Sequence, residues 1–384
     1  MNLHLYPSPF TTESRMLKEL DSIVQLGLAD EAVVLGICQP GLERQSTIGE
    51  RQRLIRLEFR LAPYFRGKIA KMVEYAEYLA GALRTGWTLR PDVLNCHSLN
   101  VLPVGVALKK MGRVQWLIYD AHELETERET LRGPAKWASK KLERLLIRHV
   151  DHVIVVSQPI AEWYVAAYPG TLVSVVRNVP NRQPAVAKND LFRQSFNIPV
   201  GDRICIYQGI LAESRGVKAL LETFADVEGG WHIVFMGFGP AEGAIREASS
   251  KTSNIHFQPA VKPEDIISYT ASADVGLLFL DHQISLSYRY SLPNKFFEYV
   301  YGGCPVIVSQ NLEHISDLVR QYDIGWPVAP DVQSLRVLLA GLDHGSIARS
   351  RVNGAAFVHA NSWEDDEQKL IAVFGGMGMN ASNG

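Results

Sequence analysis

A lysine and a carboxylate stand three residues apart within Leu292–Val308, a segment that joins a polar loop to an apolar run. Lys295 and Glu298 share one face if this part is helical, because residues three apart are neighbours on a helix surface. Pro293 suits the first helical turn and Gly302 suits the helix end. An ammonium group can bind phosphate, and a carboxylate can accept two ribose hydroxyls. The segment therefore predicts a nucleotide site.

A second cation lies in a loop that follows the apolar run Arg203–Gln208. Arg215 can pair with two phosphate oxygens at once. The helix predicted to start nearby, which carries Lys218, adds N–H donors and a favourable dipole. A surface ion pair between Arg215 and Glu213 is the alternative, and the loop context favours phosphate binding.

Three glycines lie at or just past predicted strand ends, namely Gly209, Gly237 and Gly239. A residue without a side chain lets the backbone approach a ligand closely. Gly237 and Gly239 taken alone fit a tight strand-to-helix turn equally well. They support a ligand site only together with the two cations.

Short apolar runs alternate with helix-periodic stretches in both halves, which is typical of parallel sheets covered by helices. In the first half we predict strands at Leu3–Tyr6, Ala32–Gly36, Val93–Cys96, Gln115–Tyr119 and His152–Val156. In the second half we predict strands at Arg203–Gln208, His232–Met236, Ile255–Phe257, Val275–Phe279 and Pro305–Val308. The pattern predicts two Rossmann-like domains, whose ligands bind at the carboxyl ends of the strands.

The domain boundary is predicted within 178–189, where turn and breaker residues interrupt the periodicity. We assign 1–178 to an N-terminal domain, 179–355 to a C-terminal domain, and 356–384 to a final helix with a tail. A chain of 384 residues exceeds what one core usually organises.

Composition places the chain among globular proteins, with 47% hydrophobic and 21% charged residues. Cys38, Cys96, Cys205 and Cys304 are widely spaced beside apolar runs, which indicates buried thiols rather than disulfides or zinc. No signal peptide or membrane span is predicted, so we expect a cytoplasmic protein. A pI of about 6.6 gives no support to nucleic-acid binding.

Two stretches are strongly basic, within 51–71 and 132–148. The second holds Lys136, Lys140 and Arg144 beside Trp137, and apolar residues recur at helical spacing in both. Each is interpreted as an amphipathic helix with a solvated face. Peripheral contact with an anionic membrane, at the inner face, is the less favoured alternative.

These motifs occur together in an order that resembles the retaining glycosyltransferases of family 4, also called group 1, with the GT-B fold. The matching segments are 119–123, 151–157, 177–180, 207–217, 236–240, 272–278 and 292–308. The resemblance implies an α/β fold of two Rossmann-like parallel-sheet domains facing each other across a cleft, with the last helix crossing back to the first domain.

The resemblance also implies the chemistry: a metal-independent, retaining transfer of a hexosyl group from a nucleoside-diphosphate sugar to an acceptor hydroxyl. We expect no cofactor, a glycan or lipid-linked acceptor, and a role in bacterial polysaccharide or glycolipid synthesis. His122, Glu123, Arg215 and Lys295 are the catalytic candidates, and Glu123 is the better acid or base if burial raises its pKa. Arg15 and Thr11 are placed on the acceptor side.

The donor-binding candidates combine backbone and side-chain groups of the second half. They are Gly209, Lys218, Gly237, Gly239, Val261, Ser291, Leu292, Asn294 and Glu298. The family usually has an arginine where Ile210 stands and a glutamate where Tyr290 stands. Two alternatives stay open. One is a GT-B sugar-nucleotide epimerase, and the other, which these departures favour, is a non-catalytic protein that binds a nucleotide sugar or glycan.

Overall fold

The computed structural model describes residues 1–11, 13–184 and 186–378, and the chain forms two compact units. The first unit runs from Met1 to Asn178 and is joined by the chain from Asp365 onward; the second is Val179–Glu364. The chain returns to the first unit later than the predicted residue 356. The reason is that α14 (His344–His359) packs in the second unit, where it contacts α11 (Asn294–Tyr301).

The sheet of the first unit has the order β3-β4-β2-β1-β5-β6-β7-β8 within the described residues, and every neighbouring pair is parallel except β3 with β4. Its strands are β1 (Asn2–Leu5), β2 (Ala32–Ile37), β3 (Gln45–Gly49), β4 (Gln52–Leu57), β5 (Val93–Cys96), β6 (Trp116–Ala121), β7 (His152–Val155) and β8 (Val173–Val175). The five predicted strands are confirmed to within two residues at each end. The two edges of the sheet, β3 with β4 and β8, were not predicted.

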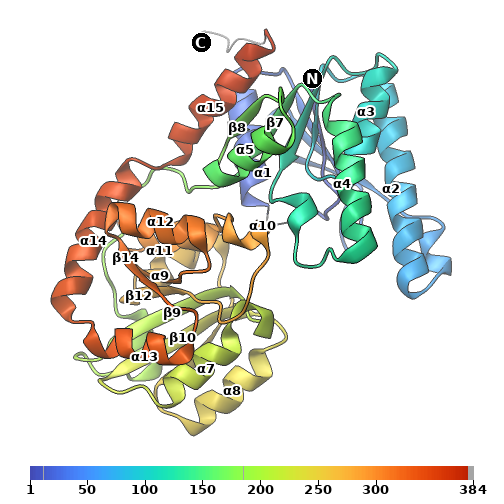
Figure 1. Cartoon of the computed structure of the whole chain (residues 1–384). Coiled ribbons are helices and arrows are strands. Elements are labelled where there is room, and N and C mark those ends of the chain that lie inside the picture. Colours follow the sequence, from blue (N-terminus) through green and yellow to red (C-terminus); the bar gives the residue numbers. More distant parts are fainter. Residues whose placement is uncertain (12, 185, 379–384) are drawn as a thin grey trace. The chain divides into compact units, whose positions relative to one another are not determined.

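Helices cover this sheet, and Figure 1 shows α2, α3 and α4 standing next to one another. The helices are α1 (Ser14–Gln25), α2 (Gly67–Leu89), α3 (Leu102–Lys110), α4 (Gly133–Ile147), α5 (Gln158–Ala167) and α15 (Trp363–Gly376), with short 3-10 turns at Ala62–Tyr64 and Glu125–Glu127. The amphipathic helix predicted in the second basic stretch is thus confirmed as α4.

The helix predicted in the first basic stretch is wrong over its first part. Residues Gln52–Leu57 form strand β4, in which Gln52, Leu54 and Arg56 are buried while Arg53 is exposed. This alternation has the period of two that a strand requires. The helical part begins only at Gly67.

The sheet of the second unit is entirely parallel, with the order β11-β10-β9-β12-β13-β14 within the described residues. Its strands are β9 (Arg203–Ile210), β10 (Trp231–Phe238), β11 (Ile255–Pro259), β12 (Val275–Leu278), β13 (Val306–Ser309) and β14 (Gly325–Val328). The five strands predicted here are confirmed, and β9, β10 and β11 each run two residues further at their carboxyl ends. Both units are therefore α/β domains built on parallel pairing.

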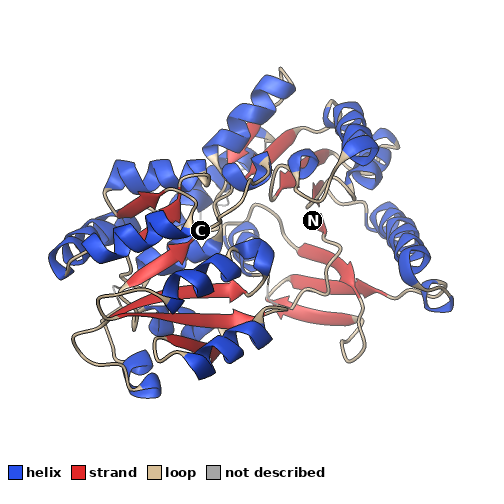
Figure 2. Cartoon of the chain, turned by 60° about the horizontal axis from the view of Figure 1, so that its bottom comes forward, coloured by secondary structure: helices blue, strands red, loops and turns tan. Residues whose placement is uncertain are grey.

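Helices lie on both faces of this second sheet. They are α6 (Leu191–Phe196), α7 (Val217–Ala225), α8 (Glu242–Lys251), α9 (Ile266–Thr270), α10 (Leu286–Arg289), α11, α12 (Glu313–Tyr322), α13 (Val332–Gly341) and α14, with 3-10 turns at Glu213–Arg215 and Pro263–Asp265. Figure 1 shows α7, α8 and α13 on one face and α9, α11 and α12 on the other. Figure 2 shows strands flanked by helices.

Helix α11 is held in place by its buried aromatic side chains. Phe296 and Phe297 are fully buried, and each such side chain contributes about 1.5–3 kcal/mol. The Tyr299 hydroxyl accepts a bond from the Gln208 backbone N–H (3.0 Å) and donates to the Leu277 carbonyl (3.2 Å). Its ring needs the space at Gly276, where an added Cβ would lie 2.3 Å from the ring. Lys295 and Glu298 therefore project from a fixed helix.

Candidate functional site

A cavity of about 490 Å³ opens at the carboxyl ends of β9, β10 and β11. The chain order reverses between β9 and β12, which is the place where open α/β sheets bind ligands. Its polar and glycine lining consists of Gln208, Gly209, Arg215, Gly237, Asn294, Lys295 and Glu298. Its apolar lining consists of Ile210, Met236, Phe238, Ala260, Val261, Ile266 and Pro293.

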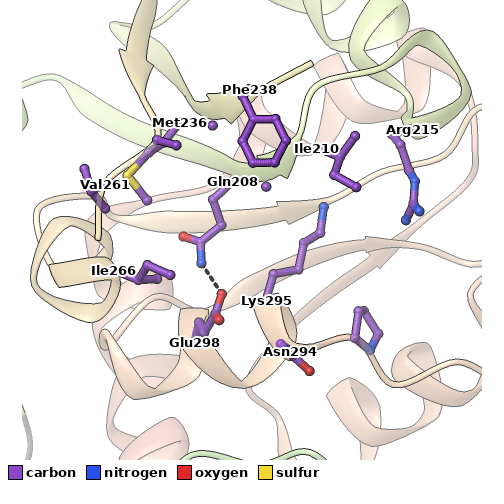
Figure 3. A pocket seen from close by; sticks show the side chains of 14 residues that line it. Gln208, Ile210, Arg215, Met236, Phe238, Val261, Ile266, Asn294, Lys295 and Glu298 are labelled. Carbon is purple, nitrogen blue, oxygen red and sulfur yellow. Dashed lines mark hydrogen bonds between the residues drawn. The ribbon is translucent and has the colours of Figure 1, made fainter. Parts of the chain in front are cut away.

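A chain of hydrogen bonds positions the Glu298 carboxylate in this cavity. The Thr270 hydroxyl donates to Gln208 Oε1 (2.8 Å), which leaves the Gln208 amide nitrogen to donate to Glu298 Oε2 (2.5 Å). Figure 3 shows Glu298 and Gln208 meeting at the centre of the cavity, from α11 and β9. A carboxylate oriented in this way has lone pairs left for ligand hydroxyls.

Lys295 lies on the same helix as Glu298, and its side chain extends toward β9. Its ammonium group is 4.3 Å from the centre of the Tyr207 ring, and an added Cβ on Gly209 would lie 4.0 Å from it. Burial, with Arg215 nearby, lowers the pKa of Lys295 to about 7, although Glu298 acts in the opposite direction. An amine that changes its charge near neutrality gains strongly from a nearby anion.

Arg215 is the second cation of the cavity and comes from the 3-10 turn Glu213–Arg215. Its guanidinium lies 5.1 Å from the centre of the Tyr288 ring. Figure 3 places Arg215 at one side of the cavity and Lys295 near its middle, so both cations can reach one diphosphate. Ile210, half exposed, lines the cavity between them, as the apolar replacement for the usual cation.

Gly216 fixes the turn that carries Arg215. It has φ +80°, and an added Cβ would lie 2.1 Å from the Phe279 carbonyl oxygen. Only glycine combines this backbone conformation with so close an approach. The position of Arg215 therefore depends on the absence of a side chain at the next residue.

Replacing Gly216 by alanine is expected to destabilise the second unit by about 2 kcal/mol or more, because the left-handed backbone and the clash add. Thermal unfolding should show a lower midpoint. Gly243→Ala is the matched control, since nothing lies within 4 Å of an added Cβ there and alanine favours the helix. Equal midpoints for the two variants would contradict this role of Gly216.

Four predicted donor-binding residues do not line this cavity. Lys218 is exposed on α7, one turn beyond the loop. Gly239 packs against backbone, where an added Cβ would lie 2.3 Å from the Leu211 oxygen. Ser291 bonds through its hydroxyl to the Tyr288 carbonyl (2.8 Å), and Leu292 is buried. The other five, Gly209, Gly237, Val261, Asn294 and Glu298, are brought together in the cavity.

Several cavity residues, above all Gln208, were not predicted from the sequence. The sequence did give one indication of its role, because Gln208 directly precedes Gly209 at the end of a predicted strand. Phe238 was also missed, and 63% of this large side chain is exposed. An apolar residue at the end of a predicted strand carries no local sign that it faces a cavity.

The first unit brings His122 into a cluster that the sequence did not predict. His122 Nε2 lies 3.0 Å from His97 Nδ1 and 3.4 Å from Asp120 Oδ2. Burial lowers the pKa of His122 more than Asp120 raises it. The His122 side chain is 27% exposed, so it remains accessible to a ligand. The sequence did contain an indication of this cluster, because His97, like His122, comes just after a predicted parallel strand.

The expectation for Glu123 rested on burial, and the structure does not provide it. The Glu123 side chain is 45% exposed and pairs with Arg128 (2.9 Å). Its neighbour Glu125 is the buried carboxyl, only 3% exposed and paired with the same arginine (2.5 Å). Burial raises the pKa of Glu125 to about 7 against the effect of Arg128. Glu125 thus has the property that was expected of Glu123.

Arg15 and Thr11 differ in their surroundings. Arg15 is buried, with Nε on Glu19 (2.7 Å) and Nη2 on Asp120 Oδ1 (2.7 Å). It therefore supports Asp120 rather than an exposed acceptor site. Burial alone would raise the pKa of Asp120, but Arg15 and then His122 and His97 hold it well below its usual range. Thr11 is an exposed loop residue.

Two groups of side chains in this cluster have the number and spacing of metal ligands: His4, Glu19 and His97, and also His97, Asp120 and His122. The sequence showed no such cluster because the side chains come from helix α1 and from the regions of three different strands, β1, β5 and β6. Arg15, paired to Asp120, opposes a divalent cation there. The absence of a metal remains a prediction.

Two family models match the chain, one in each unit. The model described as glycosyl transferase 4-like domain matches residues 22–179, and the model described as glycosyl transferases group 1 matches residues 202–340. No curated protein matches the sequence.

Solved structures with the GT-B fold match almost the whole chain at low identity. Sucrose-phosphate synthase from Thermosynechococcus elongatus has a TM-score of 0.78 at 16% identity, covering 98% of both chains. Anabaena HepE in complex with UDP and glucose has a TM-score of 0.71 at 15% identity, and the match covers 98% of this chain and 99% of that one. Trehalose 6-phosphate synthase from Burkholderia multivorans has a TM-score of 0.69 at 12% identity, and the match covers 98% of both chains. The predicted GT-B fold is confirmed.

Among the helices that the structure describes, none combines the length and apolar character needed to cross a membrane.

Proposed function

The chain belongs to the glycosyltransferases that combine a glycosyl transferase 4-like domain with a group 1 domain, and we propose that it transfers a hexosyl group from a UDP-sugar to an acceptor hydroxyl with retention and without a metal. UDP is proposed because related structures are described in complex with UDP or UDP-glucose. One observation carries the proposal most strongly. Arg215, Lys295 and Glu298 line a single cavity at the sheet reversal.

The proposed reaction needs little covalent chemistry from the protein. The bond between the anomeric carbon and the diphosphate oxygen breaks, the acceptor oxygen forms the new bond on the same face, and its proton passes to the leaving phosphate. Arg215 and Lys295 stabilise the negative charge that develops on the diphosphate. Glu298 holds the ribose, and His122 orients a substrate group.

A direct assay tests this function against its two rivals. The protein is incubated with UDP-glucose or UDP-N-acetylglucosamine, with and without a panel of glycan acceptors, and the products are followed by NMR. We expect UDP release that depends on the acceptor and a product with the anomeric configuration of the donor. Isomerisation of the donor without an acceptor would establish an epimerase. Binding without turnover across the panel would favour the non-catalytic alternative.

We further propose a lipid-linked acceptor in bacterial polysaccharide or glycolipid synthesis, met by a cytoplasmic enzyme at the inner membrane face. Support comes from α4, on which Trp137 is 65% and Leu145 52% exposed. Near α2, Tyr64 is 85% and Met72 71% exposed. Apolar side chains beside basic ones are what an anionic interface binds.

Sedimentation with anionic vesicles tests this contact. Lys136 and Lys140 pair with Glu127, so Lys141 and Arg144 are the α4 cations left to act on lipid. We expect pelleting at low salt that weakens at high salt, since each cation near the surface is worth about 1 kcal/mol. Trp137→Ala with Leu145→Ala should reduce it. No pelleting with the vesicles, even at low salt, would point to a soluble acceptor.

A further inference from the structure

Three histidine rings form a continuous hydrogen-bonded row inside the first unit, here called the histidine chain: His4, His97 and His122. His4 lies on β1, and the other two follow the ends of β5 and β6. His4 Nδ1 is 2.9 Å from His97 Nε2, and His97 Nδ1 is 3.0 Å from His122 Nε2. His4 and His97 are buried, and only His122 reaches the surface of the unit.

Each of these two contacts can hold one proton. Two N–H groups cannot face each other at 3.0 Å, and two bare nitrogens would repel through their lone pairs. A neutral imidazole carries one N–H, and an imidazolium carries two. With His4 and His122 neutral, three arrangements remain. The protons point from His4 toward His122, from His122 toward His4, or from a protonated His97 toward both neighbours.

His4, at the inner end of the histidine chain, decides between these arrangements. If His4 Nδ1 accepted a proton from His97, as in the second and third arrangements, the N–H of His4 would be on Nε2, which is buried and has no hydrogen-bond partner among the described residues. A buried N–H without a partner is rare and costly, whereas an unused lone pair is tolerated better. The outward direction leaves only a lone pair on His4 Nε2.

Asp120 favours the same direction. Its Oδ2 is 3.1 Å from His97 Nδ1 but 3.4 Å from His122 Nε2, so the carboxylate stabilises a proton on His97 more than one on His122. Arg15 holds the other oxygen of this carboxylate at 2.7 Å and so fixes the orientation of Asp120. The unpartnered His4 Nε2 and the position of Asp120 thus favour the same proton direction along the histidine chain.

We propose that the histidine chain fixes His122 as the tautomer protonated on Nδ1, with His97 as the positioning residue. His122 Nε2 accepts from His97, and Nδ1–H is left to donate to a hydroxyl or phosphate oxygen of a substrate. This inference rests on the proposed function for its substrate. A ring held in this state donates a hydrogen bond and does not serve as a general base.

Nitrogen-15 NMR of the histidine-labelled full chain tests the tautomer without any substrate. We expect His122 to show a protonated Nδ1 and an unprotonated Nε2. The opposite pattern would overturn the proposal. Added Zn²⁺ that binds His97 and His122 stoichiometrically, in place of the shared proton, would overturn it as well.

Two substitutions of His97 provide the matched pair. In His97→Asn the amide nitrogen can replace Nδ1 as donor to His122, whereas in His97→Gln the amide extends toward the position of Nε2, near His4. We expect the asparagine variant to keep the Nδ1–H tautomer of His122 and most of the turnover of UDP-glucose. The glutamine variant should lose the fixed tautomer and about tenfold in turnover, at a similar unfolding midpoint. Identical tautomers and kinetics in both variants would contradict the role of His97.

Failure of the proposed function can be distinguished from failure of the proposed tautomer. A protein that shows the expected tautomer but no transfer with any donor refutes the reaction and leaves the histidine chain as described. A protein that transfers sugar with His122 protonated on Nε2 refutes the inference alone.

Discussion

Replacing Lys295 by methionine is expected to weaken UDP binding about 10- to 100-fold near pH 7, the range for a hydrogen bond to a charged group. The neutral variant keeps an unbranched side chain of similar length and removes the ammonium group, which lies 4.3 Å from the centre of the Tyr207 ring. Uridine should bind equally to both proteins, because it has no phosphate. Isothermal titration with the two ligands measures both effects.

The pH dependence gives a sharper result than the loss itself. Burial and Arg215 lower the pKa of Lys295 to about 7 in the free protein, and a bound diphosphate must raise it. Binding therefore takes up a proton between pH 7 and pH 9. Affinity for UDP falls over this range by at most about 50-fold, the limit that is reached when the bound amine stays fully charged while the charged fraction of the free protein falls.

Titration in buffers of different ionisation enthalpy detects this proton uptake directly. The Lys295→Met variant serves as the control, because any remaining pH dependence then belongs to the phosphate or to other groups. An affinity that is flat from pH 7 to pH 9 in the wild type would show that Lys295 does not face the diphosphate.

The strands that carry the cavity were predictable because they are buried on both faces. A strand such as β9, in the centre of a parallel sheet, is a continuous apolar run, which few other elements resemble. Strand β4, which lies beside the edge strand β3, was missed for the opposite reason. It contains Gln52, Arg53 and Arg56, and the many cations of this stretch suggested a solvated helix instead.

The cavity was predictable where one short segment supplies several functional groups. Lys295 and Glu298 stand on one helix turn, and their spacing alone indicates a shared face. Gln208, which orients Glu298 from 90 positions away, has no such local signal. Its role follows from the pairing of the strands, which sequence spacing does not reveal.

The histidine chain is the extreme case of this limit. His4 and His97 are 93 positions apart and meet only because β1 pairs with β5, with His4 opposite Asn95. No motif contains both residues. The sequence shows that a histidine stands at a strand end. It does not show which ring nitrogen of that histidine carries the proton.

The second large effect is expected for Glu298→Gln, which keeps the shape of the side chain and removes its charge. We expect UDP to bind more weakly by about 1.5–3 kcal/mol, the usual contribution of a hydrogen bond to a charged group. The new amide can still accept the bond from Gln208 (2.5 Å in the wild type), so the helix should stay in place. An unchanged unfolding midpoint would confirm this.

Ligand analogues distinguish the contribution of Glu298 to nucleotide binding from that of Lys295. If Glu298 binds the ribose, the Glu298→Gln loss should be equal for UDP and for uridine, whereas the Lys295→Met loss appears with UDP alone. Removing the 2′ and 3′ hydroxyls from the ligand should weaken wild-type binding and abolish the difference between wild type and Glu298→Gln. If that difference persists with the dideoxy ligand, Glu298 acts on another part of the nucleotide and the assignment to the ribose fails.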